Sequence, residues 1–379
     1  MKKLIAVSTG LILLALLFAG CASSTNVSPE ATEKPVVATE TPPQTLEPVA
    51  ATEAPAATEE PTPANAEDTD EDPDEARGHY IFQPKVCSSY MTELFGETMT
   101  ETWFNLVDAV MAGEDTFACP DKDTYNWVMG QFPDKCFPIL PELIDYCYDR
   151  NDPVKDGMGS FVYLVSPEDA AARISEFAAL VEDILNDTLK DDYSDMEKAL
   201  ALYIYFSHHY VYDYEAANPE IYADYLSSYR VLTTGNGICQ EFSVAYSYLL
   251  LQVGVDATNM SGHRSYDDAP HQWSYVRING HNYHIDPTYV INDVDSLSYF
   301  MMSDDQRELA DSYLRNNWII CSNYAQDHPH PDYTADDDSF EAIWEGRYVG
   351  FDHRNQILTY DTSYDPYEPK LMFFNYAGW

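Results

Sequence analysis

The feature that most constrains the fold of this 379-residue chain is the dipeptide Asn279-Gly280, which separates two segments of strand character. Asn-Gly is the strongest short-range signal for a two-residue β-hairpin turn. Residues directly opposite each other in a hairpin lie on the same face of the sheet. The turn therefore fixes the cross-strand pairs, which are Ile278 with His281, Val276 with Tyr283, and Trp273 with Asp286.

The hairpin predicts a histidine close to a carboxylate. Because strand side chains alternate between the two faces, one face carries a polar and aromatic set: His271, Trp273, Tyr275, His284 and Asp286. His271 lies diagonally opposite Asp286, at a distance of roughly 7–8 Å that an imidazole and a carboxylate can span. A slip of one residue would send them to opposite faces. His284 shares this face and is an alternative to His271.

A cysteine precedes the hairpin at the start of a predicted helix. Cys239 follows Gly235-Asn236-Gly237-Ile238, and the helix has an apolar stripe of Phe242, Ala245, Tyr246, Leu249, Leu250 and Val253. A helix N-terminus and a nearby imidazolium lower a thiol pKa and favour the thiolate nucleophile. A cysteine at such a position is by itself more often a small core residue. Together with His271 and Asp286, it predicts a catalytic triad that needs no metal or organic cofactor.

The N-terminus has the character of an export signal. Lys2 and Lys3 precede an apolar run from Leu4 to Phe18, which is short for a membrane span. The sequence Phe18-Ala19-Gly20-Cys21 resembles the bacterial lipoprotein signal, in which the cysteine is lipidated. We therefore expect removal of residues 1–20 and anchoring through Cys21 at the extracellular face of a bacterial membrane. An ordinary cleaved secretory signal is the alternative, and it also implies function outside the cytoplasm.

Composition divides the remaining chain. Residues 21–78 are rich in Pro, Thr, Ala and Glu and predict a disordered acidic linker, which cannot bury enough apolar surface to fold. We expect a small helical region at 79–155, a catalytic domain at 156–330 and a β extension at 331–379. The formal net charge of the chain is -44. Such an acidic chain is not expected to bind nucleic acid, which requires a basic surface.

The remaining cysteines and histidines give weaker signals. Cys87, Cys119, Cys136, Cys147 and Cys321 permit up to two disulfides in an exported protein, with the pairing open. There is no Cys-x-x-Cys pair to indicate zinc. His208-His209 and His328-Pro329-His330 are possible metal ligands, although surface or loop histidines are commoner.

Several motifs resemble the transglutaminase-like superfamily of papain-like cysteine enzymes, in its bacterial extracellular branch. The matching motifs are Tyr210-Val211-Tyr212, Gly237-Ile238-Cys239, Gly254-Val255-Asp256-Ala257, Ser261-Gly262, His271-Gln272-Trp273, Asp286-Pro287-Thr288-Tyr289 and Tyr299 to Asp304. Glu241 departs from the family pattern, because Gly is common at that position. Gln272, Ser274 and Tyr289 depart similarly.

The resemblance implies an α+β, papain-like core in which the N-terminal catalytic helix packs on an antiparallel β-sheet. It implies Cys239 as nucleophile, His271 as acid and base, and Asp286 as the residue that orients His271. The resemblance leaves open which side chain helps to stabilise the oxyanion, and Tyr229 is one candidate.

We expect an enzyme that acts on peptide or Gln side-chain amides through a thioester. Water as the second nucleophile gives a peptidase or amidase, and an amine gives a transglutaminase. The expected partner is a protein or peptide, with cell-wall peptides as one candidate; the oligomeric state stays open. The alternative is a non-catalytic surface module that binds cell-wall or host polymers.

Overall fold

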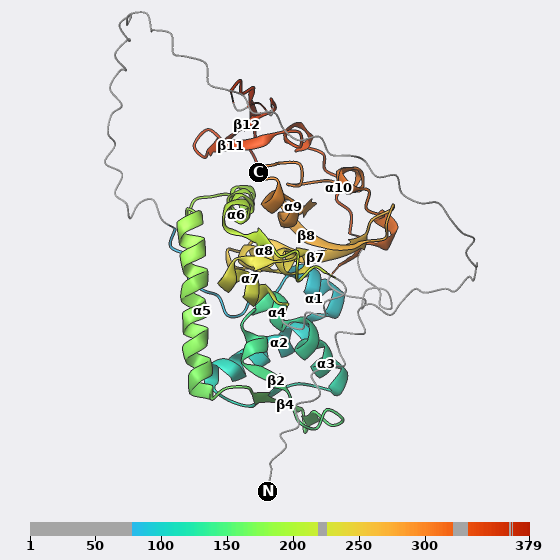
Figure 1. The fold of residues 1–379 in the computed structure, drawn as a ribbon. Helices are drawn as coiled ribbons and strands as arrows, with labels where there is room; N and C mark the ends of the chain where they lie inside the picture. The colour runs from blue at the N-terminus through green and yellow to red at the C-terminus, as the bar shows by residue number, and fades with distance from the viewer. Residues whose placement is uncertain (1–77, 219–225, 321–332, 364, 366) are drawn as a thin grey trace, which may run out of the picture. The chain divides into compact units, whose positions relative to one another are not determined.

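The computed structural model describes residues 78–218, 226–320, 333–363, 365 and 367–379 (Figure 1). Residues 71–379 form one compact unit. The expected signal, Cys21, most of the linker, Cys321 and the histidines at 328 and 330 lie outside the described residues. Among the described helices, none is long and apolar enough to span a membrane.

Residues 79–155 form helices and also three short strands. The helices are α1 (Ser89–Phe95), α2 (Glu97–Ala112), α3 (Lys122–Gln131), α4 (Pro133–Cys136) and the 3-10 helix η2 (Leu140–Glu142). The strands are β1 (Thr116–Ala118), β2 (Ile144–Tyr146) and β3 (Val154–Lys155). All three pair antiparallel with β4 (Met158–Tyr163), so this sheet crosses the domain boundary expected after residue 155.

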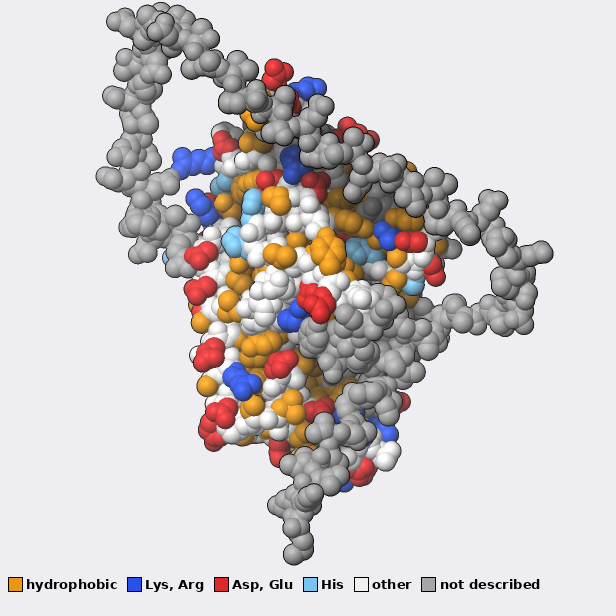
Figure 2. All heavy atoms as spheres, in the orientation of Figure 1, with side chains coloured by type: hydrophobic (Ala, Val, Ile, Leu, Met, Phe, Trp, Pro, Cys, Tyr) orange, Lys and Arg blue, Asp and Glu red, His pale blue; other side chains and the backbone are white. Residues whose placement is uncertain are grey.

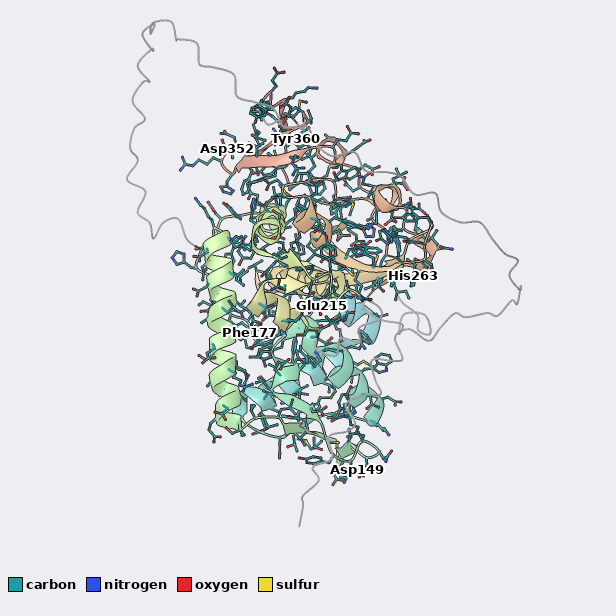
Figure 3. The ribbon with its side chains drawn as sticks, viewed as in Figure 1. Asp149, Phe177, Glu215, His263, Asp352 and Tyr360 are labelled. Carbon is teal, nitrogen blue, oxygen red and sulfur yellow. The ribbon has the colours of Figure 1, made fainter. Side chains whose placement is uncertain are left out.

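Two long helices follow, and each begins where a capping serine predicts. In α5 (Pro167–Thr188), the Ser166 side chain accepts a hydrogen bond from Asp169 N. In α6 (Asp195–His209), Ser194 forms a capping box with Glu197. The buried face of α5 contains Phe177, which is labelled in Figure 3. Its ring centroid lies 6.1 Å from that of Tyr248, in the later helix that begins at Cys239.

The helix that begins at Cys239 packs on an antiparallel sheet, which confirms the predicted α+β class. This helix is α8 (Cys239–Gln252), and the sheet has the order β10-β7-β8-β9. The strands are β7 (Asp256–His263), β8 (Pro270–Ile278), β9 (His281–Ile285) and β10 (Ile319–Ile320). Ser274 Oγ donates to Ser243 O of α8 at 2.9 Å, so the alternate residues Trp273 and Tyr275 face away from that helix.

The hairpin has the predicted register. Ile278 pairs with His281 and Val276 with Tyr283. Asn279 and Gly280 have φ angles of 51° and 81°, the positive values that a type I′ turn requires at both positions.

Short elements surround this core. A parallel pair joins β5 (Val211–Tyr212) to β6 (Asn236–Gly237), and α7 (Ser228–Thr234) lies between them in the chain. After the hairpin come α9 (Pro287–Asn292), α10 (Asp304–Asp311), and the 3-10 helices η3 (Arg315–Asn317) and η4 (Glu341–Ile343).

The C-terminal residues contain strands. They are β11 (Arg347–Asp352), β12 (Ile357–Asp361) and β13 (Leu371–Asn375), which make an antiparallel sheet in that order. The surface view shows acidic side chains spread over the described part of one face, with Lys and Arg side chains less frequent among them (Figure 2).

Candidate active site

Cys239 is the first residue of α8, and the backbone before it is tightly packed. A Cβ atom on Gly237 would lie 2.5 Å from Val231 Cγ2, so this position requires glycine. The first N–H groups of a helix have no partner within the helix and carry a partial positive charge. The half-buried thiol of Cys239 therefore lies where a helix end favours an anion.

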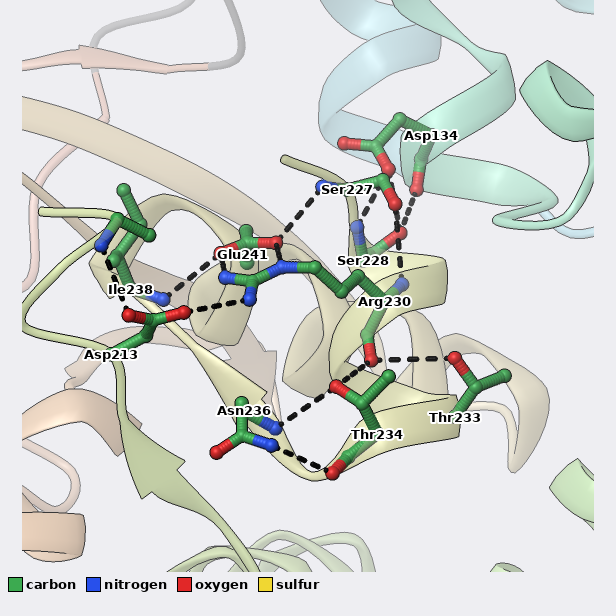
Figure 4. A network of polar contacts seen from close by, with 11 residues as sticks. Asp134, Asp213, Ser227, Ser228, Arg230, Thr233, Thr234, Asn236, Ile238 and Glu241 are labelled. Carbon is green, nitrogen blue, oxygen red and sulfur yellow. Dashed lines mark hydrogen bonds and ion pairs between the residues drawn. The ribbon is translucent and has the colours of Figure 1, made fainter. Parts of the chain in front are cut away.

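A buried ion pair holds the segment on both sides of Cys239 (Figure 4). The Glu241 carboxylate accepts hydrogen bonds from Ser227 N at 2.9 Å and from Ile238 N at 3.0 Å. It also accepts from Arg230 Nε at 2.8 Å, while Arg230 Nη1 donates to Asp213 Oδ2 at 2.9 Å. Glu241 is 1% exposed. Glu241, one of the residues that depart from the family pattern, is thus the centre of this network.

His271 and Asp286 meet as the hairpin predicts. Nε2 of His271 lies 2.7 Å from Asp286 Oδ2, and both side chains are buried. Asp286 is also the N-cap of α9, where Oδ1 accepts a hydrogen bond from Thr288 N at 3.1 Å. Because Nε2 faces the carboxylate, Nδ1 is the nitrogen of His271 left for Cys239.

The pKa values of these groups favour an ion pair. Burial alone would raise the pKa of Cys239, but the His271 charge, a hydrogen bond with His271 and another from the Gln272 backbone lower it overall. Burial opposes the charged form of His271, yet Asp286 and Cys239 raise its pKa to about 9. Burial also opposes the Asp286 carboxylate, whose pKa His271 and Arg307 nevertheless lower.

Arg307 of α10 is a buried neighbour that the sequence did not reveal. Its Nη1 donates to Asp286 Oδ2 at 2.9 Å, and its side chain is 0% exposed. The guanidinium carbon lies 4.6 Å from the ring centroid of Trp273 and 4.4 Å from that of Tyr313. In the sequence, Arg307 is a single base within an acidic helix, a pattern that indicates an ordinary surface residue.

His284 has a different environment from His271, although both lie on one face of the hairpin. Trp273 Nε1 donates to His284 Nδ1 at 2.8 Å, and His284 Nε2 lies 2.9 Å from Asp304 Oδ1. Both ring nitrogens are thus occupied by other residues. Burial lowers the pKa of His284. These contacts do not support the alternative in which His284 replaces His271.

Two tyrosines need to be placed relative to the thiol: Tyr229, the candidate for stabilising the oxyanion, and Tyr212, which belongs to a matching motif. Tyr229 packs its ring against Phe177 of α5 at 5.7 Å. Tyr212 lies in β5 opposite Gly237. This pairing brings the Tyr212 backbone beside the residues that precede Cys239, and burial, followed by the charge of Cys239, raises the pKa of Tyr212. The motif Tyr210-Val211-Tyr212 contained this residue, but the sequence did not indicate its proximity to Cys239.

The other cysteines and histidines form no second site in the described part of the chain. Cys87, Cys119 and Cys147 are free thiols, as is Cys239. His208 lies 2.8 Å from Asp295, and His209 Nδ1 lies 2.9 Å from Tyr205 O. Across the described residues, no group of three or more His, Cys, Asp or Glu side chains could hold a metal ion.

Comparison with known proteins identifies the segment that carries these residues. Residues 180–287 match the model of the transglutaminase-like superfamily, a stretch that contains Cys239, His271 and Asp286 and ends before Arg307. No curated protein compared with the chain matches it.

Two solved structures are similar to part of the chain. A transglutaminase crystal structure has 24% identity over 33% of this chain and 34% of its own, with a TM-score of 0.28. A candidate cysteine protease from Cytophaga hutchinsonii has 15% identity over 33% of this chain and 35% of its own, with a TM-score of 0.22. The chain thus spans about a third of the length of each. The part of the chain that carries the site is thus similar to the transglutaminase-like superfamily over residues 180–287.

Proposed function

We propose that the chain is a cysteine enzyme that cleaves or exchanges amide bonds through a thioester on Cys239. The observation that carries this proposal is the 2.7 Å contact between His271 Nε2 and Asp286 Oδ2, with the other side of the imidazole facing the thiol. A purely structural role for His271 would not explain why a thiol at a helix N-terminus lies beside its imidazole. The three groups together supply a nucleophile, an acid and base, and a group that orients the imidazole.

In the first half of the reaction, the Cys239 thiolate attacks the amide carbonyl carbon. The charge that develops on the carbonyl oxygen lies near the backbone N–H groups that begin α8, which can stabilise it. The imidazolium of His271 then gives its proton to the departing nitrogen. The C–N bond breaks, the amine leaves, and the acyl group remains on sulfur as a thioester.

In the second half, the neutral imidazole accepts a proton from the nucleophile that attacks the thioester. Water gives a carboxylic acid, which is the outcome for a peptidase or amidase. A primary amine gives a new amide, which is the outcome for a transglutaminase. We favour hydrolysis of peptide or Gln side-chain amides in an exported protein.

We also propose that the enzyme works outside the cytoplasm, attached to a bacterial membrane through lipidated Cys21. The support is the sequence Phe18-Ala19-Gly20-Cys21 after an apolar run. Its substrate would then be a protein or peptide at the cell surface, with cell-wall peptides as one candidate. Mass spectrometry of the protein extracted from membranes tests this: a diacylglyceryl adduct on an N-terminal Cys21 is expected, and a mature chain that starts elsewhere contradicts it.

Alkylation by iodoacetamide tests the nucleophile. We expect Cys239 to be labelled selectively below pH 7, because its pKa is lowered, and we expect His271→Ala to abolish this selectivity. The matched control is His284→Ala, which removes a buried histidine from the same hairpin face and should keep it. Labelling of the wild-type Cys239 no faster than a free thiol would refute the proposal.

A second experiment separates the two reactions. The enzyme is incubated with a Gln-containing peptide and a dansylated primary amine, and the products are resolved by mass spectrometry. Hydrolysis converts Gln to Glu or cuts the peptide, whereas transamidation attaches the fluorophore. Either product should be absent with Cys239→Ala. Amine incorporation that depends on Cys239 would show that hydrolysis is not the whole activity.

A further inference from the structure

We propose that Arg307 is a positioning residue of this site, which balances its buried charge and keeps Asp286 ionised and oriented towards His271. This inference rests on the proposed function, because it assigns Arg307 a role in the same reaction. It concerns a residue of α10, which lies beyond the segment that matches the superfamily model. The role is indirect: Arg307 acts on the imidazole through the carboxylate.

The contacts fix the Asp286 carboxylate from three directions. Its Oδ2 is 2.7 Å from His271 Nε2 and also accepts from Arg307 Nη1 at 2.9 Å. Its Oδ1 accepts from Thr288 N at 3.1 Å. Arg307 in turn is held by the aromatic faces of Trp273 and Tyr313. The carboxylate therefore has little freedom to turn away from His271.

Stability alone does not explain a buried arginine here. Burial of a guanidinium carries a large desolvation cost, and replacement of a buried ion pair by apolar groups is often neutral or stabilising. Within the described part of the chain, Nε and Nη2 of Arg307 have no hydrogen-bond partner, and the atom that Nη1 binds already binds His271. Because these contacts do not offset the desolvation cost of the guanidinium, the presence of Arg307 is better explained by the effect of its positive charge on Asp286.

The charge of Arg307 completes a neutral cluster. In the reactive state, Cys239 and Asp286 are negative, whereas His271 and Arg307 are positive. Without Arg307 the same cluster would hold one excess negative charge inside the protein. Removal of a nearby positive charge raises the pKa of each acid. The thiolate of Cys239 would then form only at higher pH.

Among the described residues, the ionisable groups on the elements around this cluster include Tyr203 of α6, Tyr212 of β5, His284 of β9, Tyr289 of α9, Asp304 of α10, and Tyr313. Tyr203, Tyr212 and Tyr313 have raised pKa values and stay neutral at pH 7. His284 lies against Asp304. None of them supplies the positive charge that Arg307 contributes.

The test measures the rate of alkylation of Cys239 against pH in the full chain and in Arg307→Met, which matches the length of the side chain without its charge. We expect the midpoint of the profile to rise by about one pH unit and the rate at pH 6 to fall about tenfold. Arg307→Lys should restore most of the wild-type profile. If the Met variant does not fold, Arg307→Gln takes its place, since it keeps a donor for Asp286 but no charge.

Arg277→Met is the matched control. Arg277 also pairs with a carboxylate, Glu93 at 3.0 Å, and lies over the ring of Tyr90 at 4.3 Å, but it belongs to the far end of β8. It should leave the pH profile unchanged. If the wild type is labelled selectively and the Arg307→Met profile has the same midpoint as the wild type, the inference about Arg307 is overturned and the proposed function stays intact. Absence of selective labelling in the wild type would overturn both.

Discussion

Glu241→Ala should destabilise the protein strongly, because the Glu241 side chain is the common acceptor of the network before Cys239. The substitution removes the hydrogen bonds between Arg230 and Glu241, keeps the one between Arg230 and Asp213, and removes the acceptor from two backbone groups, Ser227 N and Ile238 N. The side chains of Arg230 and Glu241 are 15% and 1% exposed. Loss of one partner from a buried ion pair costs about 3–5 kcal/mol.

The ion pair and the backbone groups are not independent, so their costs do not add. Each buried N–H group left without a partner costs roughly 1–3 kcal/mol by itself. The segment can relax and admit water, which reduces the sum. We therefore expect the free energy of unfolding to fall by about 3–5 kcal/mol in total, a large fraction of the roughly 5–15 kcal/mol of a typical domain.

Urea unfolding followed by circular dichroism measures this quantity, with the slope of the transition checked for a change of mechanism. The control is Asp108→Ala, which removes the partner of Lys85 from an exposed pair with side chains 59% and 43% exposed. That pair should contribute only about 0–1 kcal/mol. If Glu241→Ala and Asp108→Ala have equal midpoints, the network does not stabilise the segment, and our reasoning about it is wrong.

Three further predictions concern the site and its sheet. Because the pKa of Cys239 is lowered and that of His271 is raised to about 9, the acylation rate should rise as the thiol ionises and be lost as pH passes about 9; a rate still rising at higher pH contradicts the ion pair. His284→Ala should lower the free energy of unfolding by about 2–4 kcal/mol in urea titrations, and an unchanged midpoint would argue against a structural role. Gly262→Ala places a Cβ 2.6 Å from Trp318 Cδ1; thermal unfolding should show a loss of about 1–3 kcal/mol, and an equal melting temperature would contradict this overlap.

The predictions from sequence succeeded where the determinants are local. The turn chemistry of Asn279-Gly280 fixed the hairpin register, and this register brings His271 to Asp286. The serines at 166 and 194 cap α5 and α6 in the same local way, because a side-chain cap acts within three residues. Such signals need no knowledge of the rest of the fold.

Contacts between distant segments could not be predicted in this way. Arg307 is 21 residues from Asp286, and its position depends on how α10 packs against the hairpin. Glu241 looked only like a departure from a family pattern, because its partner Arg230 belongs to another helix. The strands β1–β3 are two or three residues long, and a strand this short has too few residues to show alternation.

The two buried histidines of the hairpin, His271 and His284, differ in the hydrogen-bond donors that their rings face. This difference decides which of them can act as a base. An indole N–H can only donate, and it can donate only to a ring nitrogen that carries no proton. Trp273 Nε1 donates to His284 Nδ1, so the proton of His284 is on Nε2, towards Asp304. His271 receives no such donor: its Nε2 faces a carboxylate and its other nitrogen faces a thiol. Alternation along the strands gives both residues the same face, and the indole of Trp273 then keeps one of them neutral while the other is free to take and release a proton.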